Sequence, residues 1–347
     1  MLEPIGSISP SRAYSLDKCA LREVLISNKK RPLLPISPAA RLGSVAHAVL
    51  EEAAKGFIHD RPTFDNCWDK HLGRIESQMS SSPIESHLVP LIDSARAFEV
   101  KKLHTWKLVL TEFIERRQLD KSNTYVGSEV WIQSHDAKVV GRIDLLIAKN
   151  GNCEIIDYKT GAIVDESGSI KEEYKLQMKM YAALYHESEG VWPNRLTLVG
   201  VDRKRFEVSF ESSNCTQLLA SFTDNIAKLN ERILEGANEA DLSSPSAETC
   251  RYCLYRPGCS NYWNQRTDSE EWPSDVAGRV VEITISGIGK IRVLLENRGR
   301  KYIVRGLSSR HLLANSIPNK LLICNLSRDK TSGQLVENQM TTCFQIE

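Results

Sequence analysis

Long hydrophobic runs are missing from this sequence, and their absence excludes one large class of proteins. Apolar stretches such as Leu321–Cys324 are far shorter than the roughly 20 residues that a membrane-spanning helix needs. The first residues also lack the basic segment and the following apolar stretch of a secretory signal. These absences predict a soluble, cytoplasmic protein that has no membrane partner.

Low-complexity segments and internal repeats are absent as well, and the formal net charge is only +1. With 41% hydrophobic and 26% charged residues, the composition is that of a globular protein, and 347 residues allow roughly two domains of about 150 residues each. The near-neutral total conceals an uneven distribution of charge. Residues 275–347 contain 11 Lys and Arg against 6 Asp and Glu, so a basic C-terminal segment follows an acidic remainder.

Hydrophobic periodicity predicts alternating helices and strands over residues 42–236. Helices with an apolar face are expected at Leu42–Ala54, Tyr174–Glu187 and Thr216–Gly236, and one or two more within Ser86–Leu119, interrupted near Pro90. Strands are expected at Val126–Gln133, Lys138–Ile147, Cys153–Tyr158, Leu196–Asp202 and Arg205–Phe210. This order predicts an α/β core in which helices flank a mixed sheet.

A different pattern follows the polar stretch Asn264–Ser274, which has the composition of a linker. Five short strands, with a short helix near Ser308–Asn315 between the third and fourth, match the order of a small all-β OB-like barrel. An SH3-like arrangement is the alternative. The strands are expected at Val276–Ser286, Lys290–Glu296, Lys301–Leu307 and Leu321–Leu326, and within Leu335–Ile346.

The sharpest local signal is a pair of short motifs on two neighbouring predicted strands, Gly-Arg-Ile-Asp ending at Asp144 and Asp-Tyr-Lys-Thr-Gly starting at Asp157. The two carboxylates can converge on one hard divalent cation such as Mg²⁺ or Mn²⁺. Lys159 lies two residues after Asp157, so both side chains point to the same face of an extended strand. Solvated charges at strand ends are the alternative interpretation, which either motif alone would favour.

With these residues the sequence resembles the PD-(D/E)XK nucleases, and within them the RecB-like branch. The resemblance implies a restriction-endonuclease-like core over about residues 9–264 in which Asp144, Asp157 and Lys159 are catalytic. It also implies that a divalent cation is held by His47, Asp144, Asp157 and the backbone carbonyl of Tyr158. His47 matches an upstream helical histidine of this branch; taken alone, it would be an ordinary histidine on a helix surface.

Two further elements of the same branch are expected on a helix and on a strand. Gln177 and Tyr181 match the QxxxY motif, and because they are four residues apart they share one face of the predicted helix. The resemblance implies that they bind substrate. Glu129 is a weaker candidate for positioning metal or water, with a plain surface glutamate as the alternative.

Four of the nine cysteines form a pattern. Cys250, Cys253 and Cys259 follow a C-x₂-C-x₅-C spacing, and Cys19 lies far upstream. Four thiolates suit either zinc or an iron–sulfur cluster, and the spacing alone does not choose between them. The resemblance does, because an N-terminal cysteine with this spacing after the nuclease core is the "iron staple" that holds a [4Fe–4S] cluster. The other five cysteines are interpreted as buried free thiols.

These inferences together predict a Mg²⁺- or Mn²⁺-dependent deoxyribonuclease, most simply an exonuclease on single-stranded or frayed DNA ends, with 5′→3′ action favoured by analogy. The expected organisation is a cluster-closed nuclease domain at residues 1–264, a linker at 265–274 and a basic OB-like domain at 275–347. DNA repair, recombination or phage defence are the expected roles. Alternatives are a non-catalytic DNA-binding scaffold and a subunit that is active only with a separate helicase, since this sequence has no GxxxxGK[ST] motif.

The basic C-terminal domain is expected to bind single-stranded DNA through phosphate contacts and base stacking. A protein-docking module is the alternative. The residues expected to contact the strand are Arg298, Arg300, Lys301, Tyr302 and Arg305.

Overall fold

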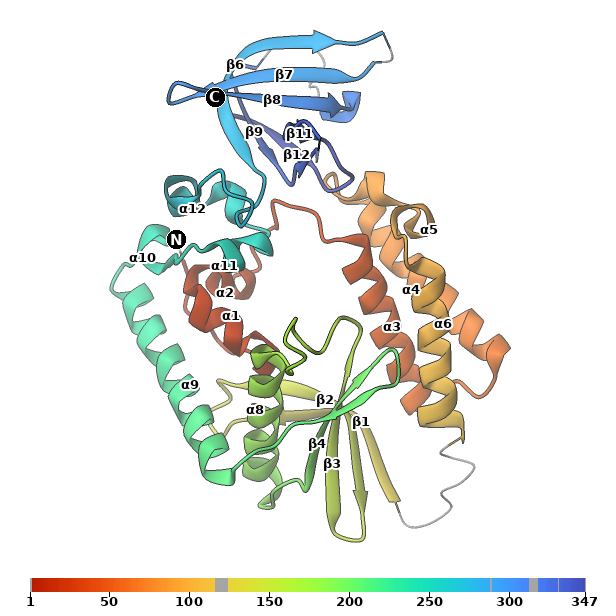
Figure 1. Ribbon diagram of the computed structural model, residues 1–347. Helices are drawn as coiled ribbons and strands as arrows, with labels where there is room; N and C mark the ends of the chain where they lie inside the picture. The colour runs from red at the N-terminus through yellow and green to blue at the C-terminus, as the bar shows by residue number, and fades with distance from the viewer. Residues whose placement is uncertain (1, 116–123, 288, 312–317, 330, 347) are drawn as a thin grey trace. The chain divides into compact units, whose positions relative to one another are not determined.

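The computed structural model describes residues 2–115, 124–287, 289–311, 318–329 and 331–346 (Figure 1). The chain divides into two compact units, and each contains segments that are distant in sequence. The first unit comprises Met1–Lys30, Pro38–Ser81 and Val89–Leu242. The second unit comprises Arg31–Ser37, Ser82–Leu88 and Ser243–Glu347.

A mixed five-stranded sheet lies at the centre of the first unit, as the sequence predicts. Its strands follow one another in the order β1-β2-β3-β4-β5. Among the described strand pairs of this sheet, only β3–β4 is parallel, and the helix α8 (Glu172–Glu189) lies in the connection between these two strands. The strands are β1 (Thr124–Gln133), β2 (Val140–Lys149), β3 (Asn152–Lys159), β4 (Arg195–Gly200) and β5 (Arg205–Glu207).

Helices cover this sheet in two groups (Figure 1). Helix α8 packs against β1, β3 and β4, and α9 (Ser212–Leu234) packs against α8. The predicted apolar stripe of α9 is buried, from Leu219 to Ile233. Helix α3 (Pro38–Ala54) contacts β1 and packs with the second group, α4 (Arg61–Ser80) and α6 (Phe98–Val109). The shorter helical elements are η1 (Pro10–Arg12), α1 (Ala13–Lys18), α2 (Ala20–Ser27), α5 (Leu91–Ser94), η3 (Leu110–Glu115) and α10 (Glu239–Leu242).

The structure departs from the sequence prediction in the helices that precede the sheet. Helix α3 begins four residues earlier than expected, at Pro38. The long helical region predicted within Ser86–Leu119 is divided into short elements, and its last residues lie outside the described ranges. Helix α4 was not predicted, because its sequence is mostly polar. In the described part of the chain, no helix is both long and apolar enough to span a membrane.

The second unit contains a seven-stranded sheet in the order β10-β11-β8-β7-β6-β9-β12. Strands β6 (Val276–Ile285), β7 (Ile291–Asn297), β8 (Arg300–Leu307) and β9 (Lys320–Cys324) lie at the predicted positions. The predicted helix between β8 and β9 begins as a 3₁₀ turn, η5 (Ser309–His311), and its remainder lies outside the described residues. The other elements are η2 (Ser86–Leu88), α11 (Ala247–Arg251), η4 (Arg256–Gly258), α12 (Ser260–Gln265), β10 (Ser327–Arg328), β11 (Leu335–Val336) and β12 (Thr342–Ile346).

A buried ion pair joins the segment before this sheet to the start of the sheet. The Arg256 guanidinium donates from Nε and Nη2 to the Asp275 carboxylate, at 2.7 and 3.1 Å, and both side chains are almost fully buried. Asp275 also accepts from the Tyr262 hydroxyl at 2.8 Å and from the Asn325 backbone N–H at 2.8 Å. The buried charges are therefore paired and hydrogen-bonded, which is the condition under which burial is tolerated.

We predict that Asp275→Ala destabilises the protein by about 3–5 kcal/mol, because it leaves the Arg256 cation buried without its partner. Chemical denaturation of the intact chain, followed by tryptophan fluorescence, measures the change. The matched control is Arg279→Ala, which removes the exposed ion pair with Glu296 and should change stability by less than about 1 kcal/mol. Equal effects of the two substitutions would contradict the prediction.

Candidate active site

The two motif aspartates meet where β2 and β3 separate. The antiparallel ladder between these strands runs from Lys149↔Asn152 to Leu145↔Ile156, so the next position places Asp144 beside Asp157. Beyond that pair, the Tyr158 N–H donates to the Asp144 carboxylate at 2.8 Å. The Asp144 carboxylate therefore accepts a hydrogen bond from a backbone N–H that lies past the end of the strand pairing and needs a partner.

A third acidic residue lies in the same row, on β1. Ser128 pairs with Leu145 and Val130 with Ile143, so the register places Glu129 opposite Asp144. Glu129 leaves the ladder because its backbone has φ 50°, in the left-handed region. Its carboxylate accepts from Arg142 Nη1 at 3.1 Å. Glu129 therefore lies in the acidic row without pairing in the ladder, and its charge is one of the causes that raise the pKa of Asp144.

Burial of this row raises the pKa of Asp144 well above its ordinary range. Desolvation is the largest cause, followed by the nearby Asp157 charge, while the Tyr158 N–H and Lys159 act in the opposite direction. Asp157 is only 3% exposed. Asp144, whose side chain is 19% exposed, and the buried Asp157 repel each other, so the site favours a cation between or beside them.

Lys159 supplies one cation to this pair. Its Nζ lies 2.8 Å from Asp157 Oδ2, donates to the Gln177 side-chain oxygen at 2.7 Å, and stands 4.5 Å from the centre of the Tyr174 ring. The expected orientation of Asp157 and Lys159 to one face is therefore found. The lysine is 14% exposed, so it is held from several sides and its orientation is fixed.

Helix α8 supports the pair from beneath through Gln177 and Tyr181, which are both about 4% exposed. The Gln177 amide donates to Asp157 Oδ1 at 2.8 Å and to the Tyr181 hydroxyl oxygen at 3.2 Å. The Tyr181 hydroxyl in turn donates to the Arg142 carbonyl at 2.8 Å. These contacts make both residues positioning groups for the acidic pair, and their expected contact with substrate stays a prediction.

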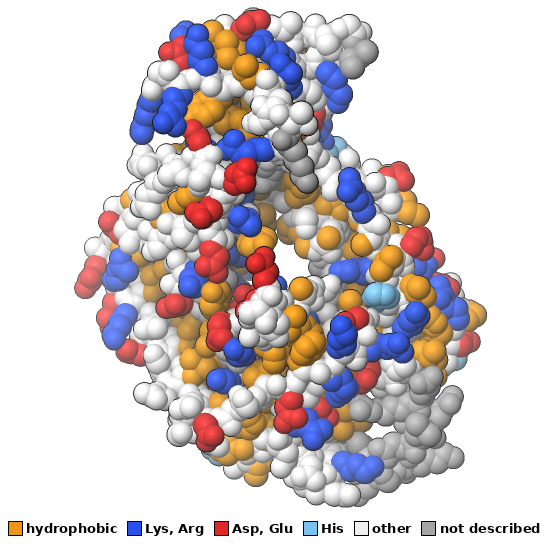
Figure 2. Space-filling view, in the orientation of Figure 1, with side chains coloured by type: hydrophobic (Ala, Val, Ile, Leu, Met, Phe, Trp, Pro, Cys, Tyr) orange, Lys and Arg blue, Asp and Glu red, His pale blue; other side chains and the backbone are white. Residues whose placement is uncertain are grey.

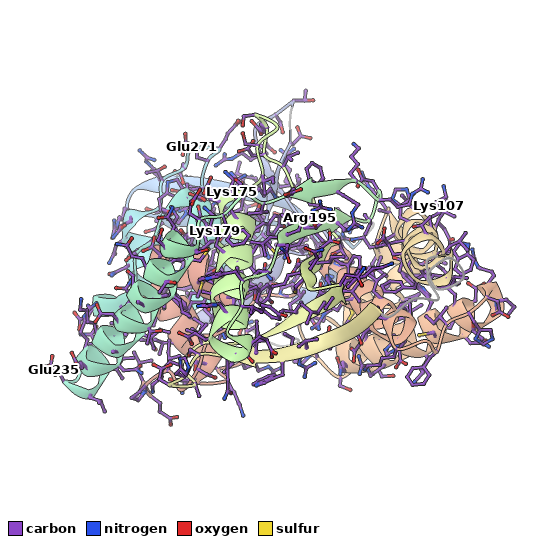
Figure 3. All side chains as sticks on the ribbon, turned by 90° about the horizontal axis from the view of Figure 1, so that it is seen from below. Lys107, Lys175, Lys179, Arg195, Glu235 and Glu271 are labelled. Carbon is purple, nitrogen blue, oxygen red and sulfur yellow. The ribbon has the colours of Figure 1, made fainter. Side chains whose placement is uncertain are left out.

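The outer surface of α8 has a different character. Lys175 and Lys179 project from this helix in Figure 3. Lys175 precedes Gln177 by two residues and Lys179 precedes Tyr181 by two residues, so each lysine lies about 200° around the helix axis from the buried residue that follows it. Lys175 forms an ion pair with Glu172 at 2.6 Å. One helix therefore presents buried hydrogen-bonding groups to the site and charged groups to solvent.

His47 approaches the same carboxylates from α3. Its Nδ1 is 4.0 Å from Asp144 Oδ2, and its side chain is 42% exposed. Desolvation lowers the pKa of His47 below its usual value, although the Asp157 charge opposes this, and Lys159 and Lys101 reinforce it. The neutral imidazole, which is the form that binds a metal, is thereby favoured at neutral pH.

Two residues that sequence reasoning missed complete the surroundings. Lys101 of α6 donates to the Thr160 carbonyl at 2.9 Å, and desolvation lowers its pKa. No local motif marks Lys101, so no signal in the sequence could have found it. Tyr174 carries the ring beside Lys159, and its position three residues before Gln177 was a usable signal.

The chemistry of the donor set fits a divalent cation. Asp144 and Asp157 lie side by side, and His47 Nδ1 is 4.0 Å from Asp144 Oδ2. Lys159 contacts Asp157 Oδ2 and the Gln177 amide contacts Oδ1, but each carboxylate oxygen has a second lone pair that can bind a metal. Within the described ranges, however, no three His, Cys, Asp or Glu side chains are grouped closely enough to form a complete metal site.

The four cysteines of the predicted cluster are distributed over both units. Cys19, between α1 and α2, belongs to the first unit, and Cys250, Cys253 and Cys259 belong to the second. Cys250 and Cys253 are buried, and Cys259 caps α12 by accepting from the Tyr262 N–H at 3.4 Å. The cluster stays a prediction.

Comparison with known families agrees with this geometry. A mixed sheet that carries an acidic pair and a lysine at the ends of two adjacent strands defines a phosphodiester-hydrolysing class of site. The family model described as the PD-(D/E)XK nuclease superfamily matches residues 7–260, and the chain belongs to this superfamily. Its members are metal-dependent nucleases, typically with Mg²⁺, that act on DNA. A search of curated proteins found no match.

Gly141 of the first motif lets α8 approach the strand. A Cβ at this position would lie 2.9 Å from Tyr181 Cε1 and 3.0 Å from Pro10 Cδ, closer than such atoms pack. We predict that Gly141→Ala displaces the Tyr181 ring and destabilises the protein by about 1–3 kcal/mol. Thermal or chemical denaturation measures the loss.

Gly161 gives the matched control for this prediction, because it closes the second motif and a Cβ there meets nothing within 4 Å. Gly161→Ala should leave stability within about 0.5 kcal/mol of the parent protein. A Gly141→Ala protein as stable as the parent would show that α8 does not depend on this close approach.

Proposed function

We propose that the chain is a deoxyribonuclease whose active site is built on Asp144, Asp157 and Lys159. The observation that carries the proposal is an aspartate pair at the ends of two adjacent strands with one lysine beside it. One lysine cannot neutralise two neighbouring carboxylates, whereas a divalent cation can. Membership of the PD-(D/E)XK superfamily supports the same assignment.

Asp144, Asp157 and the Tyr158 carbonyl, with His47 at the edge, are the groups that would hold Mg²⁺ or Mn²⁺. The bound cation would supply electrostatic stabilisation for the charge that develops on the phosphate during hydrolysis. Lys159 projects from the same face, and its ammonium can orient the attacking water and neutralise charge at phosphorus. Gln177 holds Asp157 and Lys159 together, so it fixes the distance between the metal ligand and the ammonium group.

The resemblance to the RecB-like branch supports an exonuclease that acts on single-stranded or frayed ends, with 5′→3′ polarity, in DNA repair, recombination or phage defence. The same resemblance supports a [4Fe–4S] cluster on Cys19, Cys250, Cys253 and Cys259. The strand pairing supports an OB-like second unit. There β6 pairs with β7 and β9, β8 pairs in parallel with β11, and β12 pairs with β9.

We predict that Lys159→Ala lowers DNA cleavage by about 100-fold or more, because the charge at phosphorus no longer has its ammonium partner. End-labelled single- and double-stranded DNA, with Mg²⁺ or Mn²⁺ and with each end blocked in turn, measures rate and polarity together. The wild-type chain is expected to degrade single strands, and to stop when the 5′ end is blocked.

The matched control is Lys228→Ala, since Lys228 is an exposed lysine on α9 that pairs only with Asp224 among the described residues. This variant should cleave DNA at the parent rate. Undiminished cleavage by a folded Lys159→Ala protein would overturn the catalytic assignment. Cleavage that requires an added helicase would favour the alternative of a nuclease subunit.

We predict that anaerobically purified protein is yellow-brown and contains iron and sulfide, and that Cys253→Ser loses both. Visible absorption and metal analysis measure this outcome. Cys67→Ser, on α4, is the control and should keep the colour. A colourless protein that contains zinc would contradict the prediction and would show that the protein binds zinc in place of an iron–sulfur cluster.

A further inference from the structure

A cavity of about 670 Å³ lies in the second unit, within the roughly 300–1,000 Å³ typical of small-ligand sites. Its walls come from the end of α12 and the segment that follows, from the turn between β7 and β8, and from β6, β9 and β12. All of these elements belong to the second unit. The cavity is therefore separate from the candidate active site, which the first unit contains.

The lining of the cavity combines apolar side chains with a cationic wall. Ala277, Leu322 and Ile346 contribute apolar groups, and Ile346 is 39% exposed. Three arginines and one acidic residue, Asp268, are the charged groups among the described residues that line it. Figure 2 shows Lys and Arg side chains over the visible face of this unit, and its strands carry an excess of positive charge.

Asp268 organises the cationic wall. Its carboxylate accepts from Arg266 Nη2, Arg300 Nη1 and the Tyr302 hydroxyl, each at 3.1 Å. One negative charge thus holds two guanidinium groups and an aromatic ring in place. Because a single carboxylate cannot neutralise two arginines, net positive charge remains for a ligand.

Arg266 joins the cationic wall to an aromatic ring. Its side chain is only 10% exposed, and its guanidinium lies 5.7 Å from the centre of the Trp263 ring. The guanidinium is therefore held between Asp268 and Trp263 and contributes positive charge beside an aromatic surface.

The turn between β7 and β8 adds a third arginine at the rim. Arg298 and Gly299 both have positive φ, 50° and 78°, as a two-residue hairpin turn of this hand requires. Arg298 forms no ion pair with any described residue, and Arg300, whose side chain is exposed, follows directly on the strand. The turn and the first residue of β8 therefore contribute two guanidinium groups to the lining of the cavity.

We propose that this cavity binds a nucleotide unit of single-stranded DNA, with the phosphate at Arg298 and Arg300 and the base over Trp263 and Tyr302. Arginines together with aromatic rings are the groups that hold single strands. A duplex offers no free base to fill a cavity, whereas a single strand does. The proposal rests on the nuclease function proposed above and extends it to a second contact with the same substrate.

The alternation along β8 provides a sharp test. Arg300 and Tyr302 line the cavity, while Lys301 between them points to the opposite face of the strand. Arg298→Ala with Arg300→Ala, made in the full-length Lys159→Ala chain, should weaken binding of a labelled dT₁₂ oligonucleotide about tenfold or more. The slope of log Kd against log salt concentration should fall by about 0.7 for each phosphate that the variant no longer neutralises.

Lys290→Ala is the control, because it removes one exposed charge of the same unit outside the cavity. It should change the affinity less than twofold, and a dT₁₂ containing 4-thiothymidine should crosslink to the peptide that holds Trp263 or Tyr302. An equal loss of affinity from Lys290→Ala and from the arginine substitutions would overturn the proposal in favour of diffuse charge. Stronger binding of a polyglutamate peptide than of dT₁₂ would overturn it in favour of protein docking.

The binding assay is run in EDTA, so its result does not depend on hydrolysis. A chain that cleaves DNA but binds dT₁₂ equally with and without the two arginines would overturn the cavity assignment alone. A chain that binds through the cavity and cleaves nothing would overturn the nuclease proposal alone. Thermal melting of the variants confirms that each is folded.

Discussion

Repulsion among neighbouring carboxylates is the constraint on which the site of the first unit depends. Three neighbouring strands bring Glu129, Asp144 and Asp157 into one row, and like charges side by side on a sheet are destabilising. A different local arrangement reduces the repulsion at each of the three carboxylates. Glu129 leaves the ladder, Asp144 accepts a backbone N–H and takes a raised pKa, and Asp157 receives Lys159 and Gln177. These separate contacts allow three acidic side chains to lie in one row of the sheet.

Helix α8 supplies the Gln177 side chain that contacts Asp157 and Lys159, and these contacts depend on close packing of the helix against the strands. The Gln177 amide reaches Asp157 only because the helix lies directly on the strands, and the glycine at 141 leaves the room for Tyr181. Gly43 plays the same part for α3, since a Cβ there would lie 2.8 Å from the Thr160 hydroxyl. Close approach of a helix thus explains the glycines at these two positions. The approach of α8 also allows Gln177 to reach Asp157.

Sequence patterns predicted the parts of this fold that carry strong periodicity. The five strands of the first sheet and helices α3, α8 and α9 have buried apolar faces that repeat along the chain. Helix α4 escaped because it is largely polar, although Asp60 and Thr63 form a capping box with Pro62 beside them, a signal that marks a helix start. The candidate site divides in the same way. Motifs identified Asp144, Asp157 and Lys159, whereas Lys101 comes from a distant helix and only tertiary packing brings it near.

The second unit shows what composition alone leaves out. Residues 264–274 are polar and resemble a linker, yet within them Arg266 and Asp268 are tied to Trp263, Tyr302 and Arg300. Polarity alone does not distinguish a solvated segment from one whose charges are paired across a cavity. The sequence-based expectation grouped Lys301 with Arg300, whereas only Arg300 lines the cavity, because neighbours on a strand face opposite ways. Arginine suits the cavity side, since a planar guanidinium can lie against an aromatic ring while it donates to a phosphate, which a lysine ammonium cannot do.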